Sequence, residues 1–140
     1  MIAVDTGFLF ALADRSDAWH GRALACVDTA AQGWVTTWPV LAEACYLLQR
    51  NLGTAFSAAL MDDVSEGGLR VWSPPDNQLR QIAALLRKYT KLPMDLADAS
   101  LVLLAEHLGH GQILTTDERD FGAYRWKNHK PFHNLMASPP

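Results

Sequence analysis

The chain has 140 residues, 49% of them hydrophobic, and no Gly-, Ser- or Pro-rich linker or internal repeat divides it. This fits one compact domain, placed at residues 1–135, with 136–140 as a short C-terminal tail. The formal net charge is −3, from 12 basic and 15 acidic residues, which argues against a partner held mainly by a broad basic surface. Neutralising four carboxylates with metal would leave 11 acidic charges against 12 basic ones, so the total does not argue against a polyanionic substrate.

No segment approaches the roughly 20 apolar residues of a membrane span, and the opening lacks the pattern of a signal peptide. We therefore expect a cytoplasmic protein with no membrane partner. Cys26 and Cys45 each lie in a predicted helix among apolar neighbours. This setting is typical of buried free thiols rather than of a disulfide or a metal site.

The first half of the chain alternates short apolar runs with helical patterns. Residues 2–5 predict a buried strand, followed by a helix to about residue 13 and a second helix from Asp17, its N-cap, to about residue 31. Residues 34–37 predict a strand, and Thr37 before Pro39 begins a helix that Gly53 closes. A further helix is expected over about 54–65.

The second half repeats this alternation. Residues 69–72 predict a strand, and the turn "SPPD" leads into a helix that contains Leu79, Ile82, Leu85 and Leu86. Residues 95–109 are apolar around most of the helix, as expected for burial against a sheet, and 112–116 predict another strand. "DERDFGAY" then predicts a helical turn and "YRW" a last edge strand. Because parallel strands need crossover helices, the pattern predicts an α/β fold, a three-layer α/β/α sandwich around a mainly parallel sheet of four to five strands.

Six acidic residues fall where the predicted strands end, which is where open parallel sheets bind ligands; they are Asp5, Glu43, Asp95, Asp98, Asp117 and Asp120. Each has a structural explanation as well. The last two Asp pairs have the spacing of helix caps, Glu43 fits a solvated helix boundary, and Asp5 could start a turn. Asp5 is the hardest to explain in this way, because it follows three apolar residues.

Together these carboxylates would repel one another and raise one another's pKa values, unless a cation lies among them. Oxygen ligands without His or Cys favour Mg²⁺ or Mn²⁺ over zinc. The five histidines do not offer a clear alternative. His107 and His110 flank a helix C-terminus, where positive charge is ordinary, and His129 and His133 are separated by a proline.

The order of these residues resembles the PIN-domain ribonucleases, specifically the VapC-type toxins of bacterial toxin–antitoxin pairs. The similarity rests on Asp5-Thr6 after the first strand, Glu43 in "VLAEACYLL", Asp98 in "MDLADASLVLLAEHLG" and Asp117 in "ILTTDERDF". It spans essentially the whole chain, and residues 94–121 are its most specific part. The resemblance implies a PIN-like fold and a quartet of metal ligands and catalytic residues formed by Asp5, Glu43, Asp98 and Asp117.

The resemblance also implies that Thr6 and Thr116 orient these carboxylates through their hydroxyl groups. Asp95 and Asp120 are supporting residues, and the spacing D-E-R-D-F departs from the D-x-D-F of many relatives, which puts a direct metal role for Asp120 in doubt. Arg119 is expected at the rim of the site, where it would contact substrate phosphate. The tail 124–133 mixes basic and aromatic residues, which suits RNA contact or an edge strand.

The sequence therefore predicts a Mg²⁺- or Mn²⁺-dependent endoribonuclease that acts as a toxin, with an RNA substrate, a small antitoxin and a homodimeric assembly as its implied partners. The alternatives are a solitary RNA-processing PIN nuclease and a non-catalytic interaction module that keeps the fold. Two surfaces are candidates for docking a protein partner: the helix over 54–66 and the early helices with Phe8, Phe10 and Trp19. The alternative is that the apolar side chains of these helices pack in the core.

Overall fold

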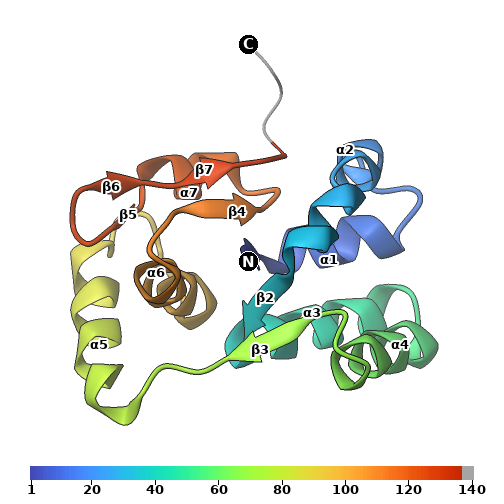
Figure 1. Ribbon diagram of the computed structural model, residues 1–140, viewed down its shortest axis with the longest axis horizontal. Coiled ribbons are helices and arrows are strands. Elements are labelled where there is room, and N and C mark those ends of the chain that lie inside the picture. Colours follow the sequence, from blue (N-terminus) through green and yellow to red (C-terminus); the bar gives the residue numbers. More distant parts are fainter. Residues whose placement is uncertain (137–140) are drawn as a thin grey trace.

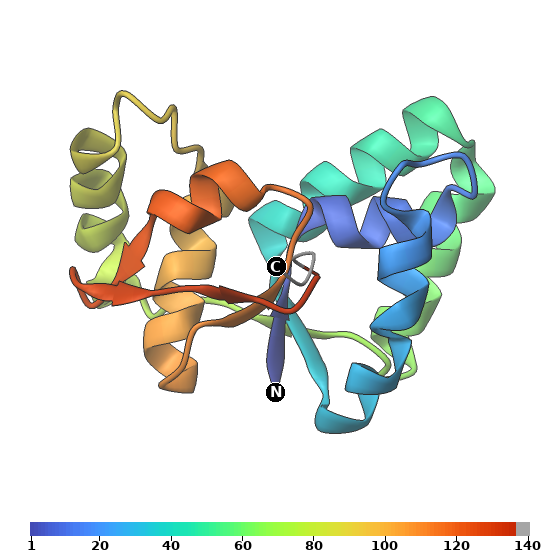
Figure 2. The same ribbon diagram turned by 90° about the horizontal axis from the view of Figure 1, so that it is seen from above.

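The structure, a computed structural model, describes residues 1–136 and contains a five-stranded parallel sheet. Its strand order is β3-β2-β1-β4-β7, with β1 at Ile2–Val4, β2 at Trp34–Thr37, β3 at Arg70–Trp72, β4 at Gln112–Leu114 and β7 at His133–Asn134. All neighbouring pairs are parallel, so the carboxyl ends of the strands share one edge. Figure 2 shows the ends of β1, β2 and β4 meeting between two groups of helices.

One group of helices lies on each side of the sheet (Figures 1 and 2). The first contains α1 (Thr6–Ala13), α2 (His20–Ala25), the 3-10 helix η1 (Val27–Gln32), α3 (Trp38–Asn51) and α4 (Thr54–Ser65). The second contains η2 (Asp76–Gln78), α5 (Leu79–Lys88), α6 (Leu96–Leu108) and α7 (Glu118–Ala123). The predicted α/β/α sandwich with a parallel sheet is confirmed.

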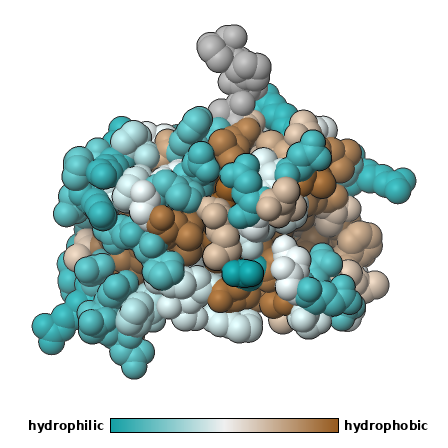
Figure 3. Space-filling model, viewed as in Figure 1, coloured by the Kyte–Doolittle hydropathy of each residue, from teal (hydrophilic) through white to brown (hydrophobic). Residues whose placement is uncertain are grey.

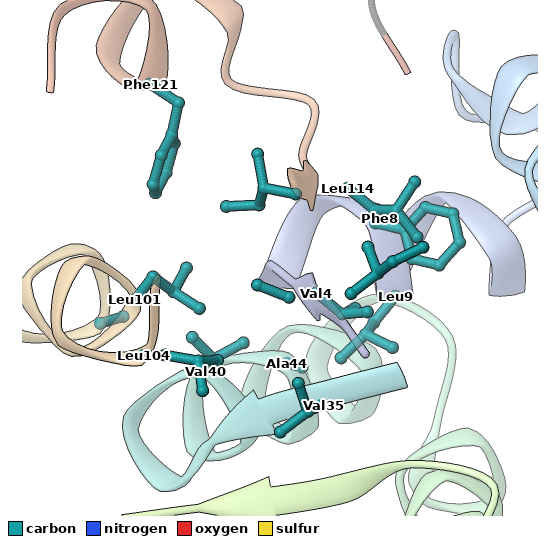
Figure 4. Packing of buried hydrophobic residues seen from close by; sticks show 14 of the residues in the cluster. Val4, Phe8, Leu9, Val35, Val40, Ala44, Leu101, Leu104, Leu114 and Phe121 are labelled. Carbon is teal, nitrogen blue, oxygen red and sulfur yellow. The ribbon is translucent and has the colours of Figure 1, made fainter. Parts of the chain in front are cut away.

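The central helix α6 anchors the core. Its buried residues run almost without interruption from Ala97 to Ala105, as expected for a helix covered on most of its surface. Leu101 and Leu104 face Val40 of α3, and Val4 of β1 lies between the two groups of helices (Figure 4). Asp95 caps the start of α6 and Gly109, with φ of +80°, ends it. The core thus fixes the ends of β1, α3 and α6 relative to one another.

The predicted helix from Asp17 to residue 31 is wrong as a single element. Asp17 does not cap it; its carboxylate accepts the Trp19 amide in a turn, and α2 begins at His20. After Cys26 the chain tightens into η1, where the Thr29 hydroxyl donates to the Cys26 carbonyl at 2.6 Å. Such side-chain bonds to the backbone compete with regular α-helix. Cys26 and Cys45 are free thiols, as expected, but they are half-buried rather than buried.

The last strands also differ from the prediction. "YRW" does not form an edge strand of the main sheet, because β5 (Arg125–Trp126) pairs antiparallel with β6 (Lys130–Pro131) in a separate hairpin. Its turn uses the left-handed backbone of Lys127 and Asn128, with φ of 49° and 64°. The sheet edge is instead β7. The strand predicted over 112–116 is shorter, since β4 ends at Leu114.

The division into a domain at 1–135 and a tail at 136–140 falls partly outside the described residues. Met136, which was assigned to the tail, is buried in the core at 2% exposure, and residues 137–140 are not described. None of the helices within residues 1–136 is long and apolar enough to cross a bilayer.

Candidate active site

Asp5 lies at the centre of the shared strand edge, between the end of β1 and the start of α1. As the N-cap of α1 it accepts the Thr6 amide on Oδ1 at 2.8 Å, while Oδ2 accepts the Thr115 hydroxyl at 2.7 Å. Only 8% of Asp5 is exposed. Its pKa is raised to about 6, mainly by burial and to a smaller extent by the charges of Glu43 and Asp117, although these two hydrogen bonds lower it.

Thr115 is a site residue that the sequence analysis missed. It is fully buried, donates to Asp5, and accepts the Asp117 amide on the same hydroxyl oxygen at 3.0 Å. It therefore links two of the predicted metal ligands. Thr116 was expected to orient the carboxylates, but it forms no such hydrogen bond with them. It lies instead against Gly7 of α1, where a Cβ added to the glycine would overlap the Thr116 hydroxyl.

Asn134 on the edge strand β7 holds Thr115 in place. Its side chain accepts the Thr115 amide at 3.3 Å and donates to the Thr115 carbonyl at 3.0 Å, so the amide group continues the β4–β7 ladder by one residue. The Met136 amide adds a third hydrogen bond at 3.1 Å. Asn134 is thus connected to Asp5 and Asp117 through Thr115. Nothing in the local sequence pattern marks it, because its partner lies 19 residues away.

Asp98 enters the site from the first turn of α6. It forms a capping box with Asp95, in which the Asp98 amide donates to Asp95 Oδ1 at 2.8 Å and the Asp95 amide donates to Asp98 Oδ2 at 3.2 Å. The hydroxyl of Tyr124 donates to the same Oδ2 at 3.2 Å. Burial raises the Asp98 pKa to about 7, and the charges of Asp95 and Asp5 contribute to this shift. Asp95 therefore does cap the helix, as its spacing allowed.

Asp117 and Asp120 form the third corner. Asp117 caps α7 and accepts the Asp120 amide on Oδ1 at 3.0 Å. The pKa of Asp120 is raised by burial and by its contact with Asp117, and the charge of Asp95 also reaches it. Glu43 is half-buried on α3, near enough for its charge to act on Asp5. The carboxylates from four segments therefore share one electrostatic environment.

The other predicted residues have simpler roles. The Thr6 amide supports Asp5, but its hydroxyl donates to the Val40 carbonyl at 3.4 Å instead of orienting a carboxylate. Arg119 is exposed on α7, and its charge lowers the pKa of the neighbouring Asp120, which fits its expected place at the rim. The tail 124–133 is not an aromatic stacking surface, because Tyr124 is fully buried and Trp126 is 6% exposed, its ring nitrogen donating to Pro131.

The potential metal-ligating atoms at this edge of the sheet are carboxylate and hydroxyl oxygens, with no His or Cys among them. This set of ligands fits a hard divalent cation. In the described part of the chain, no ion pair neutralises Asp5 or Asp98. A buried carboxylate without a cationic partner is costly, and its raised pKa is the mark of that cost. Within residues 1–136, however, no three such side chains lie close enough to hold an ion as they stand. The ligands must therefore draw closer to hold one.

Comparison with known proteins decides the family. A PIN-domain family model matches residues 2–127 of the chain. The chain belongs to the PIN-domain family. This PIN domain is also 30% identical over 122 residues to Ribonuclease VapC26 of Mycobacterium tuberculosis, an alignment that covers 87% of the chain and 90% of the relative. It is therefore homologous to the VapC ribonuclease toxins, which confirms the resemblance seen in the sequence.

A solved structure supports the fold of this PIN domain. It superposes on the crystal structure of VapC20 from Mycobacterium tuberculosis, a toxin that cleaves the sarcin–ricin loop, with a TM-score of 0.77. The match covers 86% of this chain and 92% of the other, at 23% sequence identity. At that identity the likeness shows the shared fold.

Proposed function

We propose that this PIN domain is a Mg²⁺- or Mn²⁺-dependent endoribonuclease that acts as the toxin of a toxin–antitoxin pair in the cytoplasm. The observation that carries the proposal is the buried carboxylate of Asp5 at the shared ends of β1 and β4, which has no cationic partner among the described residues and interacts with the charges of Asp98 and Asp117. A fold needs no such charge for stability. A divalent cation would compensate it, and the homology to VapC ribonucleases supports RNA as the substrate.

Asp5, Glu43, Asp98 and Asp117 would hold the metal. A bound divalent ion supplies a nucleophilic water near neutral pH and a counter-charge for the phosphate oxygens. The chain's own residues then have three tasks. Asp5 is fixed by the Thr6 amide and the Thr115 hydroxyl, so it presents its oxygens from one place. Asp117 and Asp98 each leave an oxygen, Oδ2 and Oδ1 respectively, to which no amide or hydroxyl group of the described residues donates.

Arg119 is the residue we assign to the substrate backbone. It is exposed on α7 and its charge acts on the neighbouring Asp120, so its guanidinium would meet phosphates that approach the acidic edge. Lys127 and Lys130 are exposed on the β5–β6 hairpin and provide further positive charge. We therefore expect RNA binding to weaken with salt while base-specific contacts remain few.

The antitoxin would dock on an apolar hollow of about 440 Å³ lined by Leu9, Leu12, Val27, Trp34, Phe56 and Leu60. Phe8, considered above as a docking residue, is fully buried and belongs to the core. Phe56 is 42% exposed. In Figure 3 hydrophobic residues gather more over the side of α1–α4 than over α5, which is mainly hydrophilic. Homology to the toxins also supports a homodimer, which sedimentation analysis of the purified chain would test.

The proposed activity is tested with purified protein and total RNA. We expect cleavage with Mg²⁺ or Mn²⁺ and none with EDTA, and loss of cleavage in Asp98→Asn. An Asn side chain still accepts from the Asp95 amide and the Tyr124 hydroxyl, so the helix cap is kept while the charge is lost. Glu66→Gln, on the exposed end of α4, is the matched control. Cleavage by Asp98→Asn at the wild-type rate would contradict the assignment and favour a non-catalytic interaction module.

Mapping the new RNA ends then identifies the substrate. A short reading frame directly upstream of the gene supports the toxin role, and its product should bind the wild type but not Phe56→Glu. A chain that cleaves RNA but has no such neighbour is a solitary RNA-processing nuclease.

A further inference from the structure

Tyr124 is a buried residue that the catalytic quartet does not include, although its hydroxyl contacts one member. It follows α7 directly, is fully buried, and donates to Asp98 Oδ2 at 3.2 Å. Its sequence separation from Asp98 is 26 residues. Buried tyrosines need a partner for the hydroxyl, and many find a backbone carbonyl. Here the partner is the carboxylate at the start of α6.

The ring of Tyr124 packs against two other aromatic rings. Its centroid lies 5.1 Å from that of Tyr89 and 5.1 Å from that of Phe121, both in edge-to-face geometry. Phe121 in turn packs edge-to-face on Phe132. A ring packed in this way has little freedom, so its hydroxyl occupies a fixed point beside Asp98.

The Tyr124 hydroxyl is the second hydrogen-bond donor to Asp98, and it determines which carboxylate oxygen remains available to a metal ion. Both the Asp95 amide and the Tyr124 hydroxyl donate to Oδ2, at 3.2 Å each. The backbone donor alone would allow the carboxylate to turn about its last bond. Two donors from different segments restrict this rotation, and among the described residues no amide or hydroxyl group donates to Oδ1.

We propose that Tyr124 is a positioning residue of the metal site, which holds Asp98 so that Oδ1 faces the ion. This rests on the proposed function and deepens it. Groups that orient metal ligands typically contribute 10–100-fold to metal affinity or activity. The hydroxyl of Tyr124 would act in this way without touching the ion or the RNA.

Tyr89 provides a matched control in the same aromatic cluster. Its hydroxyl accepts the Arg125 amide at 3.0 Å and forms no hydrogen bond with an acidic residue among those described. Tyr89→Phe and Tyr124→Phe therefore each remove one buried hydroxyl from neighbouring rings. A purely structural role predicts similar effects of the two substitutions on metal binding.

The test is calorimetric titration of each protein with Mn²⁺ in the absence of RNA, together with RNA cleavage measured over a range of Mn²⁺ concentrations. We expect Tyr124→Phe to bind Mn²⁺ about tenfold more weakly and to recover cleavage at high Mn²⁺. Tyr89→Phe should bind like the wild type, and thermal unfolding confirms that both variants are folded. Equal affinity in Tyr124→Phe and wild type, or an equal loss in Tyr89→Phe, overturns the inference. Failure of the wild type itself to bind Mn²⁺ overturns the proposed function with it.

Discussion

Replacing Asp5 by Asn should stabilise the metal-free protein while abolishing its activity. The substitution keeps the size of the side chain and removes the charge. Asn can still accept the Thr6 amide, but its NH₂ group now faces Thr115, whose hydroxyl proton loses its acceptor. Two opposing effects on the free energy of unfolding therefore follow, and their sizes can be estimated.

The charge is the larger effect. The pKa of Asp5 rises from 3.8 to about 6 on folding, because burial disfavours the carboxylate. At about 1.4 kcal/mol per pKa unit, the ionised group destabilises the fold by about 3 kcal/mol above pH 6. The lost hydrogen bond costs about 1 kcal/mol. The expected net gain of Asp5→Asn at pH 8 is about 2 kcal/mol.

The sign of the pH dependence follows from the same values. Because Asp5 binds its proton more tightly in the folded state than in the unfolded state, its contribution to the stability of the wild type falls as pH rises from about 4 to about 6. Below that range Asp5 is protonated in both states, and above it the full destabilisation by Asp5 is present. Asp5→Asn lacks this contribution and should show a flatter profile.

The assay is urea unfolding of wild type, Asp5→Asn and the control Glu66→Gln between pH 4 and 8, with and without Mn²⁺. Mn²⁺ should stabilise the wild type and not Asp5→Asn, since the ion binds the folded state. An Asp5→Asn protein less stable than the wild type at pH 8 would contradict the destabilisation by the buried charge, and equal stabilisation by Mn²⁺ would contradict a metal-binding role for Asp5.

Two further substitutions test the supports of the site. Asn134→Ala removes three hydrogen bonds and should lower the free energy of unfolding by about 1–3 kcal/mol, as measured by urea unfolding. It should also weaken Mn²⁺ binding, measured by calorimetry, because Thr115 is held less firmly. His133→Ala, exposed on the same strand, is the control, and equal Mn²⁺ affinity in Asn134→Ala and wild type would contradict a role for Asn134 in positioning the metal ligands. Gly7→Ala should lower the thermal midpoint and the cleavage rate because its Cβ overlaps the Thr116 hydroxyl. Gly21→Ala has open space around the new Cβ and should be neutral or stabilising, so a harmless Gly7→Ala would show that Thr116 can move freely.

Much of the fold could be predicted because its signals are local. Each of three elements is marked by a signal within a few residues of sequence. These signals are the apolar run of β1, the Thr37 N-cap of α3 and the apolar residues around most of α6. The places where a predicted helix is interrupted depend on contacts that the hydrophobic pattern does not show. The Thr29 hydroxyl, for example, accepts a hydrogen bond from the Trp34 ring nitrogen and donates one to the Cys26 carbonyl. This pair of hydrogen bonds favours η1 over a continued α-helix.

The site could be predicted only in part, because some of its residues are marked by local signals and others are not. Carboxylates at strand ends are visible in sequence, whereas the choice between two adjacent threonines depends on where β4 ends. Asn134 fixes that point through the sheet edge, so Thr115 faces Asp5 and Thr116 faces Gly7. The contact of Tyr124 with Asp98 depends on the packing of three aromatic rings, which no spacing rule contains.

The most direct test of the central claim is a diffraction experiment on crystals grown with Mn²⁺, using its anomalous signal to locate the ion. We expect a peak within about 2.3 Å of carboxylate oxygens of Asp5 and Asp98, with Glu43 and Asp117 drawn toward it. A protein that cleaves RNA with Mn²⁺ while the ion binds elsewhere, or that shows no peak at this edge of the sheet, would contradict it.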